Sequence, residues 1–302
     1  MKLSILGCYA ATPRTFTNPT SQVLQIKKHL FLIDCAEGTQ VQLRRNKIRF
    51  SKIQHIFISH LHGDHFFGLV GLISTFRLLN RQTELHVYGP KGIKEIITLQ
   101  LKLSNSWTNY PLYFHELTRK EPEVIFEDES LSVETIPLNH RVYTNGFLFR
   151  EKPGDRKLLV HEALKYNIDK SLFKSLKKGK DVVSEDGELI ANHLVTEAPP
   201  QPMSYAFCSD TIFDPGLVPQ LKYVSVLYHE STFLESELRI AAPTKHSTAK
   251  QAATIARDAE VGTLILGHYS TRYFSLDLFK EEAETIFSKV ELADDGKEFV
   301  FE

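Results

Sequence analysis

Short hydrophobic runs bounded by turn residues predict β-strands throughout the first third of the chain. They are rich in Ile, Leu and Val and end near Gly, Pro or Asn, as strands do. The predicted strands are LSILG (3–7), SQVLQI (21–26), HLFLIDC (29–35), IQHIFISH (53–60) and LHVYGP (85–90), followed by short strands at 113–117, 123–126 and 131–137. Between them, apolar residues recur three and four positions apart, which predicts helices. These helices span 37–46, 69–80 and 91–104.

The last third of the chain repeats this alternation. Strands are predicted at 204–210, 224–230 and 261–268, helices at 247–260 and 276–288, and the chain closes with EFVFE. Strands that alternate with helices indicate an α/β fold. The segments IFISH and LILGH each end an apolar strand in histidine, one in each half of the chain. A sandwich of two similar sheets would therefore place both histidines at one sheet edge.

Residues 151–192 interrupt the pattern with a basic, turn-rich insertion. The turn signals PG, KG and DG surround a helical stretch, and residues 151–181 hold nine Lys or Arg against five Asp or Glu. Four lysines lie within seven residues at Lys174, Lys177, Lys178 and Lys180. A solvated surface helix explains such a run. A protruding arm that binds a phosphate backbone explains it equally in kind.

The composition is that of an ordinary globular protein. The 302 residues carry 36 Lys and Arg against 37 Asp and Glu, and 42% are hydrophobic. Three cysteines without a CxxC pair argue against a disulfide framework, and no signal peptide or membrane-spanning run is apparent. A cytoplasmic enzyme with no membrane partner is expected. The net charge of −1 argues against a nucleic-acid partner, but the surplus of four (9 − 5) in residues 151–181 removes that objection.

The segment SHLHGDHFFGL concentrates metal-binding side chains in six positions. His60 and His62 face the same side of an extended strand end, so that both can bind one metal ion. Asp64 and His65 follow in the turn that enters a helix and can reach a second ion. Imidazoles and carboxylates that hold two cations are a common means of activating water near neutral pH. Packing alone does not explain this cluster, so a metal site is expected.

The same segment matches the HxHxDH motif of the metallo-β-lactamase superfamily, and further blocks resemble the ribonuclease Z family. IDCAEGTQVQL (33–43) resembles the family's DCGEGTQ segment, with Ala36 where Gly is usual. YAFCSDT (205–211) resembles the GDT block, with Ser209 replacing Gly. The other matching blocks are PLNHRVYTNGFLF (137–149), HESTF (229–233), KHSTAKQAA (245–253) and LGHYSTRY (266–273). The matches occur in the family's order, which makes them more specific than HxHxDH alone.

The resemblance implies a single metallo-β-lactamase domain over 1–302, an αββα sandwich from which residues 151–192 protrude as a basic arm. It also implies two divalent ions per subunit, with zinc favoured and manganese or iron also compatible. One ion would bind His60, His62 and His140, the other Asp64, His65 and His268, and Asp210 would bridge them.

The implied activity is endonucleolytic removal of the 3′ trailer from precursor tRNA. Hydroxide attack on a phosphodiester would leave a 3′-hydroxyl on the tRNA and a 5′-phosphate on the trailer. The family assigns the role of base to Asp64, and His246 is the candidate proton donor to the leaving oxygen. His246 precedes a helix N-terminus that can bind phosphate, and Glu230 is expected to orient it. His229 is a looser candidate with a supporting role.

Family members hold tRNA with the arm, and the arm of one subunit serves the other's active site. The four arm lysines and a homodimer are therefore expected to contribute to binding of precursor tRNA, with no DNA partner. The arm's usual Gly-Pro turn is absent and NIDKSLFKSL stands in its place. This departure leaves the geometry of the arm open.

Two alternatives remain open from the sequence. A different dimetal hydrolase of the superfamily, such as a cyclic-nucleotide phosphodiesterase or an arylsulfatase-like enzyme, would share the metal ligands and need no arm. A non-catalytic RNA-binding module would keep the fold, although an intact set of seven ligands argues against it.

Overall fold

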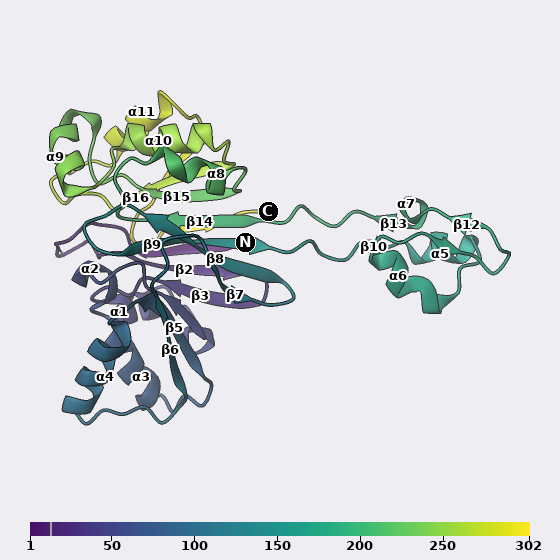
Figure 1. Ribbon diagram of the computed structural model, residues 1–302, viewed down its shortest axis with the longest axis horizontal. Helices are drawn as coiled ribbons and strands as arrows, with labels where there is room; N and C mark the ends of the chain where they lie inside the picture. Colours follow the sequence, from purple (N-terminus) through teal and green to yellow (C-terminus); the bar gives the residue numbers. More distant parts are fainter. Residues whose placement is uncertain (13) are drawn as a thin grey trace.

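The computed structural model describes residues 1–12 and 14–302, and its body is built around two seven-stranded sheets (Figure 1). The first sheet has the order β18-β1-β2-β3-β4-β5-β6. Its strands are β1 (Lys2–Gly7), β2 (Ser21–Ile26), β3 (His29–Ile33), β4 (His55–Phe57), β5 (Leu85–Pro90), β6 (Leu112–Leu117) and β18 (Glu298–Val300). Strands β3 to β6 run parallel, whereas β18, β1, β2 and β3 pair antiparallel in succession.

The second sheet has the order β17-β16-β15-β14-β9-β8-β7. Its strands are β7 (Val124–Glu127), β8 (Leu131–Leu138), β9 (Thr144–Glu151), β14 (Ser204–Cys208), β15 (Val226–Glu230), β16 (Thr263–Gly267) and β17 (Val290–Leu292). Strands β14 to β17 are parallel, and β7, β8, β9 and β14 pair antiparallel. Each sheet therefore contains a parallel half, as the alternation of strands and helices predicts.

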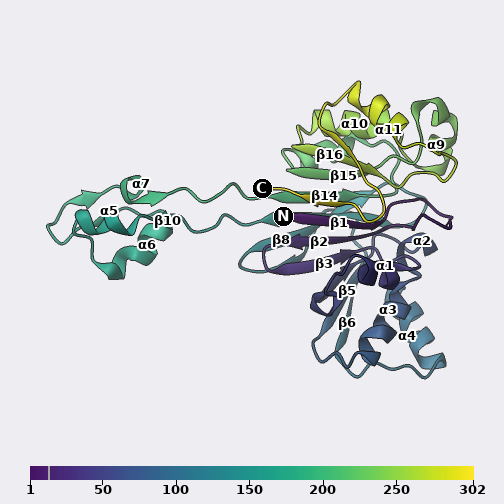
Figure 2. The same cartoon turned by 180° about the vertical axis from the view of Figure 1, so that it is seen from behind.

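Helices cover the outer faces of the two sheets, as Figures 1 and 2 show from opposite sides. The helices beside the first sheet are α1 (Thr39–Arg45), α2 (Gly63–Phe66), α3 (Leu69–Leu78) and α4 (Ile93–Leu103), with the 3-10 turn η1 (Phe50–Lys52). Those beside the second sheet are α8 (Val218–Leu221), α9 (Leu238–Thr244), α10 (Ala249–Asp258) and α11 (Asp277–Glu284), with the turns η3 (Pro215–Leu217) and η4 (Glu235–Glu237). The two sheets and their outer helices form the αββα sandwich expected from the sequence.

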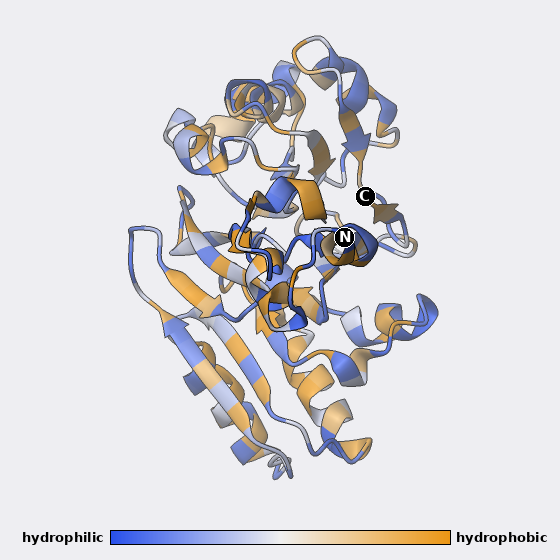
Figure 3. Ribbon diagram, turned by 90° about the vertical axis from the view of Figure 1, so that its right-hand side faces the viewer, coloured by the Kyte–Doolittle hydropathy of each residue, from blue (hydrophilic) through white to orange (hydrophobic). Residues whose placement is uncertain are grey.

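Neighbouring residues of β3 are buried on opposite faces of the first sheet. Phe31 and Ile33 belong to the core between the sheets, and Leu32 belongs to the core under α3 and α4. Strands that are buried on both faces read as continuous hydrophobic runs. Figure 3, viewed along the long axis, shows the remaining strands and helices banded in hydrophobic and polar residues.

Strand β4 is shorter than the predicted 53–60 and covers only His55–Phe57. Beyond its end, the backbone N–H of Ser59 donates to the carboxylate of Asp34 at 2.7 Å instead of to a neighbouring strand. The chain thus leaves the sheet just before His60. Because the carboxyl ends of parallel strands share one sheet edge, His60 after β4 and His268 after β16 meet there, as predicted.

The chain between Lys152 and Pro202 leaves the body as a long two-chain stalk with a small lobe at its end (Figures 1 and 2). The lobe contains β10 (Lys157–Leu158), α5 (Val160–Lys165), η2 (Lys170–Leu172), α6 (Phe173–Lys177), β11 (Val182–Val183), β12 (Leu189–Ile190), α7 (Asn192–Val195) and β13 (Thr196–Glu197). Its own core includes Ala163, Leu176 and Val195. The projection continues past residue 192, because β13 returns to pair with β10.

The sequence NIDKSLFKSL forms the turn of this lobe without a Gly-Pro pair. The carboxylate of Asp169 accepts the Ser171 backbone N–H at 2.8 Å and caps η2, which leads directly into α6. In the described parts of the chain, no helix has the length and apolar character needed to cross a membrane.

Candidate metal centre and active site

Seven side chains gather in two groups at the sheet edge where β4, β14 and β16 end. Within each group, the possible ligand atoms lie within 4.8 Å of one another. The first group is His60, His62, His140 and Asp210, and the second is Asp64, His65 and His268. The structure thus brings together all seven side chains that the sequence proposed as ligands.

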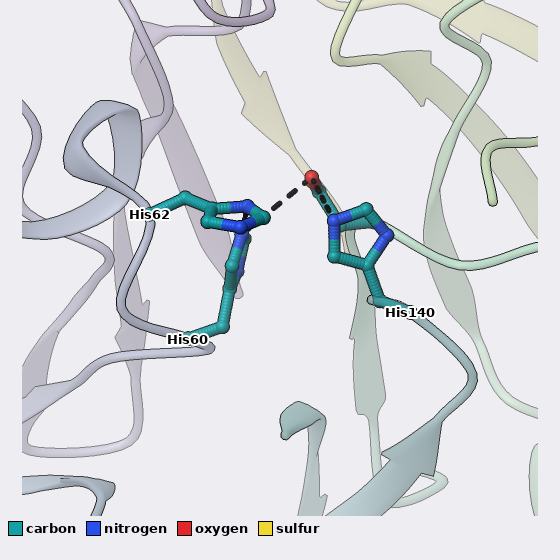
Figure 4. Close-up of side chains that lie close together, drawn as sticks. His60, His62 and His140 are labelled. Carbon is teal, nitrogen blue, oxygen red and sulfur yellow. Dashed lines mark hydrogen bonds and ion pairs between the residues drawn. The ribbon is translucent and has the colours of Figure 1, made fainter. Parts of the chain in front are cut away.

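The first group is a set of converging imidazole rings. Nε2 of His60 lies 3.0 Å from Nδ1 of His62. His140 enters from the loop between β8 and β9, and its Nδ1 donates to the Lys245 carbonyl at 3.1 Å. Figure 4 shows His60, His62 and His140 turned toward a common point. Three imidazoles so arranged can hold one cation.

The second group is oriented by hydrogen bonds on the far side of each ring. Nδ1 of His65 bonds the Asp34 carboxylate at 2.7 Å, and Nδ1 of His268 bonds the Thr232 hydroxyl oxygen at 2.9 Å. Asp64, in the first turn of α2, accepts the Ala11 backbone N–H at 2.8 Å. Hydrogen bonds of this kind orient a metal-binding imidazole and direct its free nitrogen toward the ion.

Asp210 lies between the two groups and divides its oxygens between them. Oδ1 is 3.3 Å from Nε2 of His65 and 3.1 Å from Nε2 of His268. Oδ2 is 3.6 Å from Nε2 of both His60 and His140. One carboxylate oxygen toward each group is the arrangement expected of a bridging ligand.

The donor set fits divalent cations because several buried nitrogens have nothing else to bind. In the described chain, Nε2 of His65, of His140 and of His268 is buried and has no hydrogen-bond partner. An unpaired buried polar atom costs about 1–3 kcal/mol, which a bound cation would recover. A His/Asp cluster of this composition can therefore hold metal ions.

The charges around His65 favour a cation at the second group. Although burial opposes it, the carboxylates of Asp210, Asp34 and Asp64 hold the pKa of His65 well above its usual value. Conversely, burial and the neighbouring His65 keep the pKa of His60 well below its usual value. The first group thus presents neutral imidazoles, and the carboxylates create a field that stabilises positive charge.

Three residues of the centre have left-handed backbone conformations that side chains rarely adopt. The φ angles are 32° at Asp210, 58° at His268 and 55° at Asp34. Such a conformation costs about 1–3 kcal/mol and persists where the surroundings enforce it. All three residues follow strand ends and are almost fully buried. Strain concentrated here is typical of a functional site.

His246 and Glu230 form a buried pair beside the metal centre. Nδ1 of His246 lies 2.8 Å from the Glu230 carboxylate. Burial lowers the pKa of His246, but the charge and hydrogen bond of Glu230 outweigh it and raise that pKa to about 9. His246 is therefore protonated near neutral pH and can donate a proton. His229 is buried nearby, where its Nδ1 donates to the Glu230 backbone carbonyl at 2.7 Å.

Asp34 and Thr232 were missed as functional residues by sequence reasoning. Asp34 holds both His65 and Ser59, and the Thr232 hydroxyl donates to Glu230 at 2.6 Å while it contacts His268. For Asp34, a signal was available, because it is an acid at the end of an apolar strand in the segment IDCAEGTQ.

Asp34→Asn is expected to weaken zinc binding by about 10- to 100-fold, because the amide no longer stabilises a His65 ring that donates from Nδ1. The measurement is zinc affinity by competition with a chromophoric chelator. Ser4→Ala, which removes a hydroxyl bonded to Glu298, serves as control. Unchanged affinity in Asp34→Asn would show that Asp34 does not position His65.

The four arm lysines lie apart from this centre, on the projecting lobe (Figure 1). Lys178 is ion-paired with Asp155 at 2.7 Å, whereas no ion pair of Lys174, Lys177 or Lys180 occurs in the described structure. A role of these lysines in RNA binding stays a prediction.

Comparison with known proteins gives matches over part and over nearly all of the chain. The family model of Anti-Pycsar protein Apyc1 matches residues 1–195. A ribonuclease Z of Bacteroides fragilis is 46% identical over 292 residues, which cover 97% of this chain and 96% of that protein.

Solved structures show the same architecture. Human tRNase Z, short form, superposes with a TM-score of 0.73 at 25% identity, covering 99% of both chains. The metallo-β-lactamase fold protein YhfI from Bacillus subtilis has a TM-score of 0.68 at 17% identity, covering 99% of this chain and 98% of its own. The second likeness shows the fold alone, which is that of the metallo-β-lactamases.

Proposed function

Because the chain belongs to the ribonuclease Z family, we infer that it is a metal-dependent endoribonuclease that processes the 3′ end of precursor tRNA. Over residues 1–195, it also belongs to the family that the Apyc1 model describes. That shorter match excludes Asp210, Glu230, His246 and His268, whereas the Bacteroides fragilis relative matches nearly the whole chain. The near full-length match, together with a complete donor set, supports ribonuclease Z over another hydrolase of the fold.

Two divalent ions are the proposed cofactor, with zinc favoured and manganese or iron compatible. The first group of donors would hold one ion, the second would hold the other, and Asp210 would bridge them. When bound, the ions supply the polarisation that lets water attack at neutral pH, and they neutralise charge on the phosphodiester oxygens. The support is the division of the Asp210 oxygens between the groups and the unpaired ring nitrogens.

The protein's own side chains would handle the protons. Asp64 is the proposed acceptor of the proton of the attacking water, because its carboxylate stands at the edge of the cluster and remains ionised beside His65. As the water oxygen bonds to phosphorus and the bond to the tRNA 3′-oxygen breaks, His246 would donate its proton to that oxygen. Glu230 would hold the His246 ring and stabilise its positive charge.

His246→Ala is expected to slow precursor-tRNA cleavage by about 10²- to 10⁴-fold, the usual contribution of general acid catalysis. Hydrolysis of bis(p-nitrophenyl) phosphate is expected to change by only a few fold, since p-nitrophenolate leaves without a proton. Single-turnover rates on both substrates measure this contrast. Equal losses on both substrates would assign His246 to the integrity of the centre instead of to proton donation.

The projecting lobe is the proposed tRNA-binding arm, and the homodimer implied by the family resemblance is part of the same proposal. The lobe lies far along the stalk from the metal centre (Figure 1), so that it suits contact with a part of the tRNA remote from the cut. Its lysines would contribute affinity and salt dependence and leave the chemical step unchanged.

The decisive experiment incubates protein reconstituted with zinc with a precursor tRNA and maps the cut to the nucleotide. Cleavage at or near the last base before the CCA position, with a 3′-hydroxyl on the tRNA, is the expected result. Hydrolysis of small phosphodiesters without any cleavage of precursor tRNA would favour another hydrolase of this fold, and binding without cleavage would favour an RNA-binding module.

A further inference from the structure

A cavity of about 410 Å³ opens beside His140. One wall is the segment after β6, with Arg119 and Lys120, and the opposite wall is the paired ends of β8 and β9, with Pro137 and Asn145. Binding pockets for small molecules commonly have volumes of about 300–1,000 Å³. The cavity is thus large enough for one nucleotide unit next to the metal centre.

The side chain of Asn145 is an unpaired buried amide in the wall of this cavity. It is 1% exposed, and neither its oxygen nor its nitrogen has a hydrogen-bond partner in the described chain. The neighbouring Tyr143 hydroxyl is already donated to the Arg119 carbonyl at 2.7 Å. Burial raises the pKa of the Tyr143 phenol, and the nearby Asn145 amide opposes that rise only in part. Leaving the amide unpaired costs about 1–3 kcal/mol, which a ligand with matching groups would recover.

The position of Asn145 is rigidly tied to the metal centre. Its backbone N–H donates to the carbonyl of Ser59 at 3.1 Å, immediately before the ligand His60. The next residue, Gly146, packs so closely on β14 that a Cβ would lie 2.3 Å from the Phe207 carbonyl oxygen. A ligand held by the amide would therefore have a defined position relative to the cluster.

The charges at this cavity suit a phosphate together with a base. Arg119 is ion-paired with Glu123 at 3.1 Å, whereas Lys120 is exposed and has no ion pair in the described chain. The carboxylate of Asp214, which also lines the cavity, accepts the Gly216 backbone N–H at 2.8 Å. Lys120 thus offers a free cation, and an asparagine amide offers the paired donor and acceptor that recognise the edge of a base.

We propose that this cavity is a subsite for one nucleotide adjoining the scissile phosphodiester. The Asn145 amide hydrogen-bonds the base edge, and Lys120 binds a phosphate of the same strand. The proposal rests on the proposed function and adds to it a specificity-determining residue.

The test uses Asn145→Leu, which keeps the volume and removes the hydrogen-bonding groups. Substrates are precursor tRNAs that differ in the nucleotide on the 5′ side or on the 3′ side of the cut, with bis(p-nitrophenyl) phosphate as a substrate without a base. The expected result is a fall in kcat/KM of about 5- to 150-fold for the preferred precursor and loss of nucleotide preference on one side of the cut. Hydrolysis of the small diester is expected to stay at the wild-type rate.

Lys120→Ala provides a second variant on an exposed side chain that does not affect folding. It is expected to raise KM for precursor tRNA and reduce the salt dependence, without changing kcat. Lys102→Ala on α4 is the matched control. Wild-type nucleotide preference in Asn145→Leu, or an equal loss on the small diester, would overturn the subsite alone. Absence of precursor cleavage by the wild-type protein would overturn the proposed function and the subsite with it.

Discussion

Asp210→Asn is expected to reduce precursor-tRNA cleavage by about 10³-fold or more and to lower the bound metal per chain. The carboxylate is the one group that contacts both sets of histidines, and its charge balances their cations. A metal ion contributes several kcal/mol to such a reaction, and each 1.4 kcal/mol corresponds to about a tenfold change in rate. The measurements are kcat on precursor tRNA and metal content by mass spectrometry.

Asp258→Asn is the matched control for this substitution. Asp258 is an exposed carboxylate on α10, ion-paired only with Arg257, and its loss is expected to leave metal content and kcat unchanged. Circular dichroism confirms that both variants are folded. An Asp210→Asn variant that retains two ions and wild-type activity would contradict the bridging role.

Replacement of residues 155–200 by a short Gly-Ser linker is expected to lower kcat/KM for precursor tRNA by about 10²-fold or more. Hydrolysis of bis(p-nitrophenyl) phosphate is expected to stay unchanged. The lobe has its own core, separate from both cores of the body, so the body is expected to fold without it. Lost phosphate contacts reduce affinity, and the chemistry stays with the metal centre.

The triple variant Lys174→Ala, Lys177→Ala, Lys180→Ala tests the same arm without removing it. The slope of log affinity against log salt is expected to fall by about 0.7–0.9 for each lysine that contacts a phosphate. Triple alanine replacement of the body lysines Lys91, Lys94 and Lys102 is the control. Wild-type tRNA cleavage after arm replacement would refute the arm's role in binding.

Much of the metal centre could be predicted because its ligands follow local patterns. His60, His62, Asp64 and His65 form one continuous motif, and His268 follows an apolar strand with the same grammar. Asp34 was harder to recognise, because its function depends on a bond to His65 across the sheet. Asn145 gave no signal at all, since an asparagine near a strand start is ordinary until its burial and lack of partners are known.

The projecting segment shows a similar division. The turn signals and the charge surplus identified an insertion, but the sequence placed its end at residue 192. The structure extends the projection to Pro202, because β10 and β13, distant in sequence, pair across the stalk. Pairing between distant segments depends on the path of the whole chain and leaves little trace in local composition.

The sequence by itself determined the order of strands and helices and the side chains able to bind metal, because periodicity and residue chemistry are local properties. Only the tertiary structure decided how those side chains divide into two groups, with one Asp210 oxygen toward each. It also decided which atoms stay unpaired after burial, among them three imidazole nitrogens and the Asn145 amide. Satisfaction of a buried polar group depends on neighbours from every part of the chain, and these are brought together only by folding.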